Sequence, residues 1–148
     1  MANSTQYAKT VAASPSKIST TELHGRVRVA YADFTSAAAQ ETINMFKLPD
    51  GARIIGGRLN HAALGSSTTV SVGHAAYVNA AGTTVALDVD EYKAAASSAS
   101  ATGSAVASTT ALGENSLVDA PDGLIVTATT AGANATGLIT VQMTYVLD

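Results

Sequence analysis

The chain has 148 residues, a formal net charge of −3 and no cysteine. This length corresponds to one domain, and the small negative charge argues against binding nucleic acid through its phosphates. The absence of cysteine excludes disulfides, thiolate metal sites and a cysteine nucleophile, and it fits folding in a reducing cytoplasm. We expect no membrane association, because no apolar run approaches the roughly 18 residues of a membrane span and the N-terminus lacks a signal-peptide pattern.

The composition is poor in both charged and aromatic side chains. Charged residues make up 13% of the chain and aromatic residues 5%, while alanine, serine and threonine are abundant. A surface of such small side chains loses little on desolvation and therefore suits close contact with other subunits. An alanine-rich genome accounts for the same composition equally well.

Residues 1–22 are predicted to form an extended N-terminal arm. They are polar, contain Pro15 and show no apolar periodicity, so they are either disordered or fold onto a neighbouring subunit. Residues 23–148 are then a single β-sandwich domain. Its first strand is predicted over Gly25–Phe34, where Val27, Val29 and Tyr31 alternate with polar or small residues and form the buried face.

The next strands follow short turn signals. A strand near Ile43–Phe46 ends at Pro49, and Pro49-Asp50-Gly51 is a turn that introduces a strand over Ala52–Leu64. Gly56-Gly57 predicts a bulge or bend in that strand. Gly65-Ser66 reverses the chain, so that Thr68–Tyr77 forms a hairpin with the preceding strand. Turn 79–82 and a short strand over 83–87 come next.

Asp88–Ala96 is predicted to be the one helix, because Asp88 and Glu91 have capping-box spacing and good helix formers follow. Residues 97–111 are either an exposed loop or a weak strand. Pro121-Asp122-Gly123 repeats the earlier turn before a strand over Leu124–Thr130. After a hairpin loop over 132–137, the clearest alternation of the chain predicts a core strand with these residues buried: Ile139, Val141, Met143, Tyr145 and Leu147.

About eight short strands and one helix predict an all-β fold, a two-sheet antiparallel sandwich that is jelly-roll-like, with one short inserted helix. A Greek-key sandwich of another topology remains open at this point.

No set of residues predicts catalysis or a cofactor site. His61 and His74 would form a two-histidine metal site if their strands were adjacent, although two surface imidazoles are the simpler interpretation. Asp88, Asp90 and Glu91 fit helix capping better than a calcium site. There is no G-x-S-x-G elbow and no phosphate-binding loop around Gly51–Gly57. We therefore expect a protein that is not an enzyme, with no catalytic, cofactor-binding or metal-binding residues and no cofactors.

Three segments carry a resemblance to a known family. They are Leu48-Pro-Asp-Gly-Ala-Arg-Ile-Ile-Gly-Gly-Arg-Leu59, Leu64-Gly-Ser-Ser-Thr-Thr-Val-Ser-Val-Gly73 and Gly137-Leu-Ile-Thr-Val-Gln-Met-Thr-Tyr-Val146. With these, the chain resembles the head decoration (cement) proteins of tailed bacteriophages. The resemblance implies a jelly-roll-like homotrimer, assembled in the bacterial host cytoplasm, that binds the major capsid protein on the outer surface of the virion between capsomers.

In that role the arm would reach a neighbouring subunit or the capsid, with Tyr7, Lys9 and Lys17 as its candidate contacts. The alternative function is a carbohydrate- or receptor-binding module of a phage fibre or tail. Such sites use exposed aromatic rings, and Tyr77 and Tyr92 are the candidates because Tyr31 and Tyr145 are predicted to face the core. A small hydrolase is the third hypothesis.

Overall fold

The computed structural model of the protein describes residues 4, 8, 25–37 and 40–147. Almost all of the predicted arm lies outside these residues, as do its candidate contacts Tyr7, Lys9 and Lys17. The elements in chain order are β1 (Arg26–Ser36), β2 (Thr42–Leu48), β3 (Arg53–His61), β4 (Thr68–His74), β5 (Tyr77–Val78), β6 (Thr84–Val85), β7 (Asp88–Ser97), β8 (Thr102–Val106), the 3-10 helix η1 (Thr110–Leu112), β9 (Leu124–Gly132) and β10 (Gly137–Leu147).

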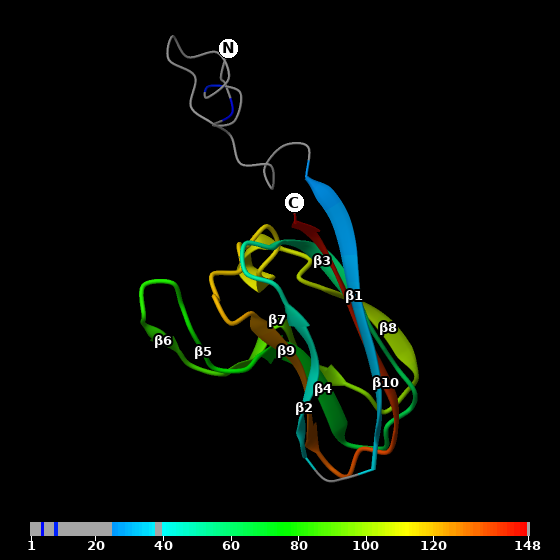
Figure 1. The fold of residues 1–148 in the computed structure, drawn as a ribbon. Coiled ribbons are helices and arrows are strands. Elements are labelled where there is room, and N and C mark those ends of the chain that lie inside the picture. Colours follow the sequence, from blue (N-terminus) through cyan, green and yellow to red (C-terminus); the bar gives the residue numbers. More distant parts are fainter. Residues whose placement is uncertain (1–3, 5–7, 9–24, 38–39, 148) are drawn as a thin grey trace.

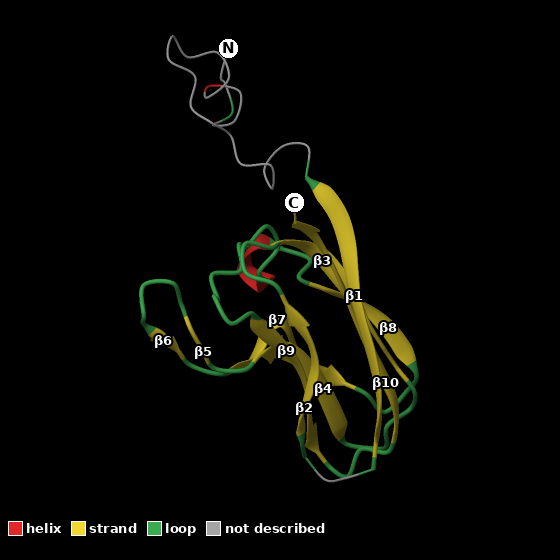
Figure 2. Cartoon of the chain, in the orientation of Figure 1, coloured by secondary structure: helices red, strands yellow, loops and turns green. Residues whose placement is uncertain are grey.

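Two four-stranded antiparallel sheets pack face to face and form the body of the molecule (Figure 1). One sheet has the order β1-β10-β3-β8 and the other β2-β9-β4-β7, while β5 and β6 form a separate two-stranded hairpin. Figure 2 shows that strands dominate and that the short helix lies at one end of the sandwich. The predicted all-β sandwich is therefore confirmed.

The strand order is that of a jelly roll. From β1 to β4, and again from β7 to β10, each strand lies in the sheet opposite to the one before it, which is how two interleaved Greek keys wrap around one core. Two predicted hairpins are consequently wrong. β3 and β4 belong to different sheets, and so do β9 and β10, because the loops after His61 and Gly132 cross from one sheet to the other.

The inner faces of both sheets bury one continuous hydrophobic core. Ile139, Val141 and Met143 of β10 are fully buried, as their alternation predicts. Across the core, the fully buried side chains of the other sheet include Leu48, Val70, Val72 and Val126. Large apolar side chains on alternate positions of facing strands are what holds such a sandwich together.

β7 replaces the predicted helix over Asp88–Ala96. The strand pairs with β4 and buries Tyr92 in the core, and this tertiary burial outweighs the helix propensity of its alanines. The Asp88 carboxylate accepts a hydrogen bond from the Asp90 backbone N–H at 3.0 Å. This local side-chain-to-backbone bond lies at the start of a strand and does not cap a helix. Gly73 lets β7 lie close, because a Cβ there would overlap the Asp88 carbonyl.

β1 is an edge strand, and the face predicted to be buried is the exposed one. Val27, Val29 and Tyr31 are between 60% and 64% exposed. They pair with Val146, Thr144 and Gln142 on the outer side of β10, whereas the small Ala30 packs against the core. The alternation of β1 was predicted correctly, but the register with β10 places Ala30 opposite the buried Met143 and places Val29 opposite Thr144 on the outer side.

Local turn chemistry is confirmed at both Pro-Asp-Gly segments. Gly51 and Gly123 have φ values of +76° and +81°, which is the conformation that such turns require of their glycine. The bulge also forms, because the register between β3 and β10 skips Ile55 immediately before Gly56. Residues 97–111 contain a short strand, β8, and the start of η1.

Candidate functional site

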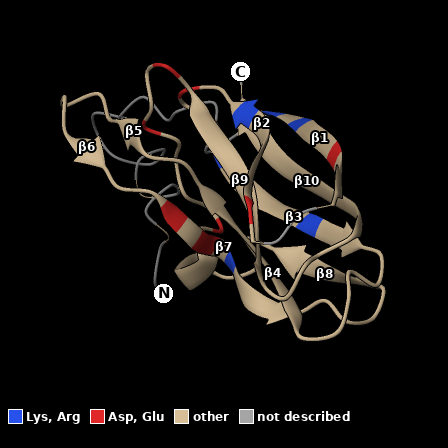
Figure 3. Cartoon of the chain, turned by 90° about the horizontal axis from the view of Figure 1, so that it is seen from below, with Lys and Arg blue, Asp and Glu red and all other residues tan. Residues whose placement is uncertain are grey.

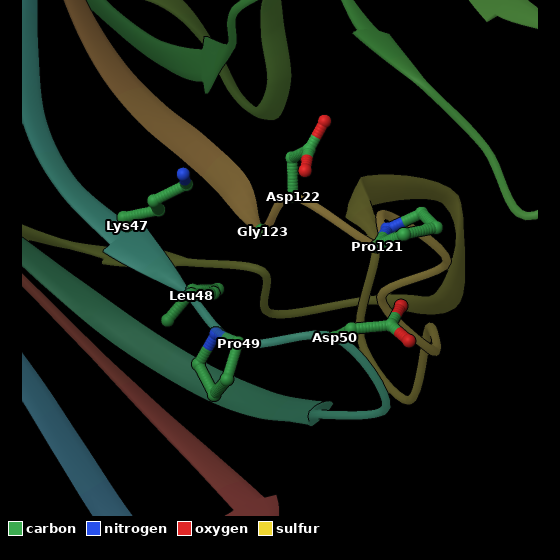
Figure 4. A pocket seen from close by; sticks show the side chains of 7 residues that line it. All are labelled: Lys47, Leu48, Pro49, Asp50, Pro121, Asp122 and Gly123. Atoms are coloured by element: carbon green, nitrogen blue, oxygen red, sulfur yellow. The ribbon is translucent and has the colours of Figure 1, made fainter.

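A hollow of about 360 Å³ lies between the two Pro-Asp-Gly turns (Figure 4). The Asp50 carboxylate accepts a hydrogen bond from the Ala120 backbone N–H at 2.8 Å, and the Gly51 N–H donates to the Val118 carbonyl. These bonds tie the two turns together. The aspartate therefore already has a structural partner.

The side chains that line this hollow have no arrangement for catalysis. Its ionisable groups are Lys47, Asp50 and Asp122, and in Figure 4 the two carboxylates point in different directions. General acid–base catalysis needs two such groups converging on one substrate atom. The hollow is open and shallow, and it offers no nucleophile paired with a base.

The two histidines considered as a metal site lie in different sheets. His61 is the last residue of β3, and the loop after it leads to the start of β4. His74 is the last residue of β4, and the strand between its start and His74 is about 20 Å long. Each ring Nδ1 lies within hydrogen-bond distance of the next residue's carbonyl, Ala62 or Ala75. Among the residues that the structure describes, no group of three histidine, aspartate or glutamate side chains is placed to hold a metal ion.

The acidic segment at the start of β7 has linked pKa shifts. The backbone N–H of Asp90 donates to the Asp88 carboxylate and holds the pKa of that carboxyl below its usual value. The side-chain hydrogen bond with Asp88 raises the pKa of Asp90 instead. The two neighbouring carboxylates have opposite pKa shifts because they share one hydrogen-bond network. This network stabilises the first turn of the backbone at the start of β7.

Tyr92 lies against His74 at the end of the core, with ring centroids 6.1 Å apart. Burial raises the pKa of the Tyr92 hydroxyl above its ordinary range, with further contributions from Glu91, Tyr77 and Asp88. A ring that is only 4% exposed offers no platform for a sugar, and Tyr77 is half-buried beside His74. The two tyrosines proposed for glycan binding are therefore parts of the fold.

We expect the Tyr92→Phe variant to keep more of its stability at alkaline pH than the wild type. Because the folded-state pKa of Tyr92 is raised, its contribution is fully present below the unfolded pKa of about 10 and is lost progressively as the pH rises from there towards the folded value. Urea unfolding from pH 8 to 11 measures this difference, with Tyr31→Phe as the exposed control. Parallel pH profiles for the wild type and Tyr92→Phe would contradict the prediction.

The outer side of β1 is a flat apolar surface. We call it the β1 face and define it by Val27, Val29 and Tyr31; Arg26 and Arg28, also exposed, occupy the alternate positions of the same strand. Because β1 is the last strand of its sheet, the backbone groups on its free side have no strand partner among the described residues. Long apolar edge strands tend to be covered by a partner chain.

A second exposed apolar surface lies on the other side of the molecule. The β5–β6 hairpin projects from the sandwich (Figure 1) and is tied back by the Ala80 N–H, which donates to the Asp119 carboxylate at 3.1 Å. Val78, Leu87 and Leu117 are 50% to 52% exposed there. With the acidic residues Asp88, Asp90 and Asp119 they form what we call the hairpin lobe.

Sequence reasoning did not find these two surfaces. It placed Tyr31 in the core together with Tyr145, whereas Tyr31 is exposed and Tyr145 is partly buried against the core. The available signal was the segment Arg26-Val-Arg-Val29, in which the charged residues next to the valines fit an edge strand. Tyr7, Lys9 and Lys17 lie outside the described residues. No helix in the described part of the chain has the length and apolarity needed to cross a membrane.

Comparisons with known proteins give matches at the level of structure. No family model and no curated protein matches the sequence. A chain of the cyanophage Pam1 capsid asymmetric unit is 21% identical, with a TM-score of 0.56 over 84% of this chain and 86% of that one. A chain of the acid-stable capsid of Helicobacter pylori bacteriophage KHP30 is 19% identical, with a TM-score of 0.57 over 82% and 87%.

A chain of the Ralstonia phage GP4 capsid is 18% identical, with a TM-score of 0.58 over 84% of this chain and 86% of that one. The likeness therefore extends over most of both chains in all three cases. At these identities it establishes a shared fold. The chain has the jelly-roll fold of chains found in three phage capsid structures.

Proposed function

We propose that this protein is a capsid decoration (cement) protein, a non-enzymatic virion component that binds the major capsid protein on the outer surface of a phage head between capsomers. The observation that carries the proposal is the fold shared over more than four fifths of the chain with chains of three phage capsid structures. A jelly roll by itself serves many functions, so the lack of a catalytic arrangement in the described residues adds support.

A protein in this role stabilises the capsid through binding alone and catalyses no reaction. A decoration protein adds contact area at the weak points between capsomers, and repetition over a symmetric shell multiplies contacts that are individually small. We infer a homotrimer that is assembled in the bacterial host cytoplasm. A surface poor in charged residues loses little on desolvation, which suits a protein whose role is contact.

Co-sedimentation with capsids that lack this protein tests the proposal. We expect the intact chain to pellet with such capsids at a fixed ratio to the major capsid protein and to raise the temperature at which they open. A chain that stays in the supernatant would overturn the decoration role. Glycan-array binding would then support the alternative, a carbohydrate- or receptor-binding module of a fibre or tail.

The arm has a separate prediction. We expect deletion of residues 1–22 to leave the sandwich folded, because its core lies within residues 43–143, and to weaken capsid binding by at least about tenfold. A full-length Tyr7→Ala, Lys9→Ala, Lys17→Ala variant tests the three candidate contacts, with Lys93→Ala as the control. Binding of the truncated chain equal to that of the intact one would contradict this prediction.

A further inference from the structure

Most of the large exposed apolar side chains in the described residues gather on two surfaces. Among the described residues, nine large hydrophobic side chains are exposed. Four lie on the outer side of β1 or of β10 beside it, namely Val27, Val29, Tyr31 and Leu138, and three lie on the hairpin lobe, namely Val78, Leu87 and Leu117. The other two, Phe34 on the opposite face of β1 and Ile55 on β3, belong to neither surface. Exposed apolar patches of this kind mark sites of association.

The two surfaces face different directions. In Figures 1 and 3 the hairpin projects on one side of the sandwich, and β1 lies on the opposite side. A single chain therefore cannot cover one of its patches with the other. Two copies in the same orientation, placed side by side, can bring the β1 face of one against the hairpin lobe of the next.

The charges around the two surfaces are complementary. On β1, Arg26 and Arg28 are exposed at the positions that alternate with the apolar residues, and Asp33 is the one acidic residue of the strand. Asp88, Asp90 and Asp119 flank the apolar residues of the hairpin lobe. Figure 3 shows basic segments on β1, β2 and β3 and acidic segments on β7 and the loops near the hairpin, together with an acidic segment on β1 and a basic one on β7. The hydrogen bonds of Arg28, Arg53 and Arg58 go to two carbonyls and an amide oxygen, which leaves their charge unneutralised by those partners.

We propose that copies of this chain associate through a heterologous contact, in which the β1 face of one subunit packs against the hairpin lobe of the next. The proposal deepens the homotrimer of the proposed function and rests on it. Because the two contacting surfaces differ, each subunit presents one of each, and the contact repeats around a ring until it closes. Opposite charges around the apolar centres fix the orientation and disfavour contact between two identical surfaces.

Two aspartate substitutions separate the two surfaces. Val29→Asp places a negative charge in the β1 face, and Leu87→Asp places one in the hairpin lobe. Both positions are exposed, so neither change disturbs the core, and an outward charge on an edge strand is well tolerated. Ala99→Asp, at an exposed position of the loop between β7 and β8, is the matched control. Thermal unfolding of each variant verifies that it is folded.

Native mass spectrometry and sedimentation velocity then measure assembly. We expect the wild type and Ala99→Asp to be trimers, and each of the other two variants alone to be monomeric, with apparent affinity at least about tenfold lower. A mixture of Val29→Asp and Leu87→Asp retains one intact pair of surfaces, namely the lobe of the first and the β1 face of the second. The mixture should therefore form a one-to-one dimer and nothing larger.

Three results would overturn the heterologous contact. They are a monomeric wild type, trimers that persist in both variants, and a variant that forms dimers by itself. The last would show a contact between identical surfaces. Co-sedimentation of the wild-type chain with capsids is measured separately. A protein that gives one of these three results but still pellets with capsids refutes this contact and leaves the decoration role intact.

Discussion

The Gly132→Ala variant is expected to lose about 3 kcal/mol or more of its free energy of unfolding. Gly132 ends β9 with a φ of +87°, a conformation that an alanine adopts only with strain. A methyl group at this position would also overlap the carbonyl oxygen of Ser67. That carbonyl accepts the Ala133 N–H, and Thr68 beside it pairs with Gly132, so the backbone cannot move away without loosening the pairing of β4 and β9.

Gly82→Ala separates the two causes. Gly82 has a similar φ of +79°, but a Cβ there would meet no atom within 4 Å. Its substitution should therefore cost only the backbone strain, about 1 kcal/mol. Urea unfolding of both variants measures the difference, which is the contribution of the close contact with Ser67. Equal losses in the two variants would show that Ser67 moves aside and that the contact is not tight.

We expect Ile139→Ala to lower the free energy of unfolding by about 2 to 5 kcal/mol. The Ile139 side chain is fully buried between the sheets, and β10 is held by β1 on one side and β3 on the other. The strand cannot collapse into the space that the truncation leaves, because both of its neighbours fix its position. The loss therefore includes the cavity as well as the transfer free energy of the missing atoms.

Leu138→Ala is the matched control, one residue earlier on the same strand. Leu138 is 45% exposed on the outer side of the sheet, so its truncation should change the free energy of unfolding by less than about 0.5 kcal/mol in dilute solution. Chemical unfolding followed by circular dichroism compares the two. A similar loss at both positions would mean that β10 is not oriented as its alternation indicates.

Local features of the sequence predicted much of this fold. The alternation from Ile139 to Leu147 identified a core strand, and the Pro-Asp-Gly segments at 49–51 and 121–123 identified two turns, because side-chain period and turn chemistry are properties of short segments. The number and short spacing of the predicted strands then predicted a two-sheet sandwich. Nothing in these signals states which strands become neighbours.

The predictions that were wrong have a common cause, namely strand pairing between segments that are far apart in the sequence. Asp88–Ala96 has the composition of a helix, yet its pairing with β4 and the burial of Tyr92 make it a strand. His61 and His74 follow one another closely along the chain, yet the loop between them crosses from one sheet to the other. The alternation of β1 also could not predict which of its two faces is buried, because it only divides the residues into two faces. The register with β10 decides this, and it places Ala30 on the inner side.

The β1 face and the hairpin lobe also show which features the sequence predicts and which depend on the tertiary structure. The sequence by itself determined an all-β domain poor in charge, without a recognisable catalytic motif, and with turns and a core strand at specific residues. Only the tertiary structure decided that Val27, Val29 and Tyr31 are exposed on an edge strand, and that Leu87 and Leu117 are exposed on the hairpin lobe. The reason is physical: alternation requires two faces, but which face is buried depends on partners more than 100 residues away, as in the pairing of Arg28 with Tyr145.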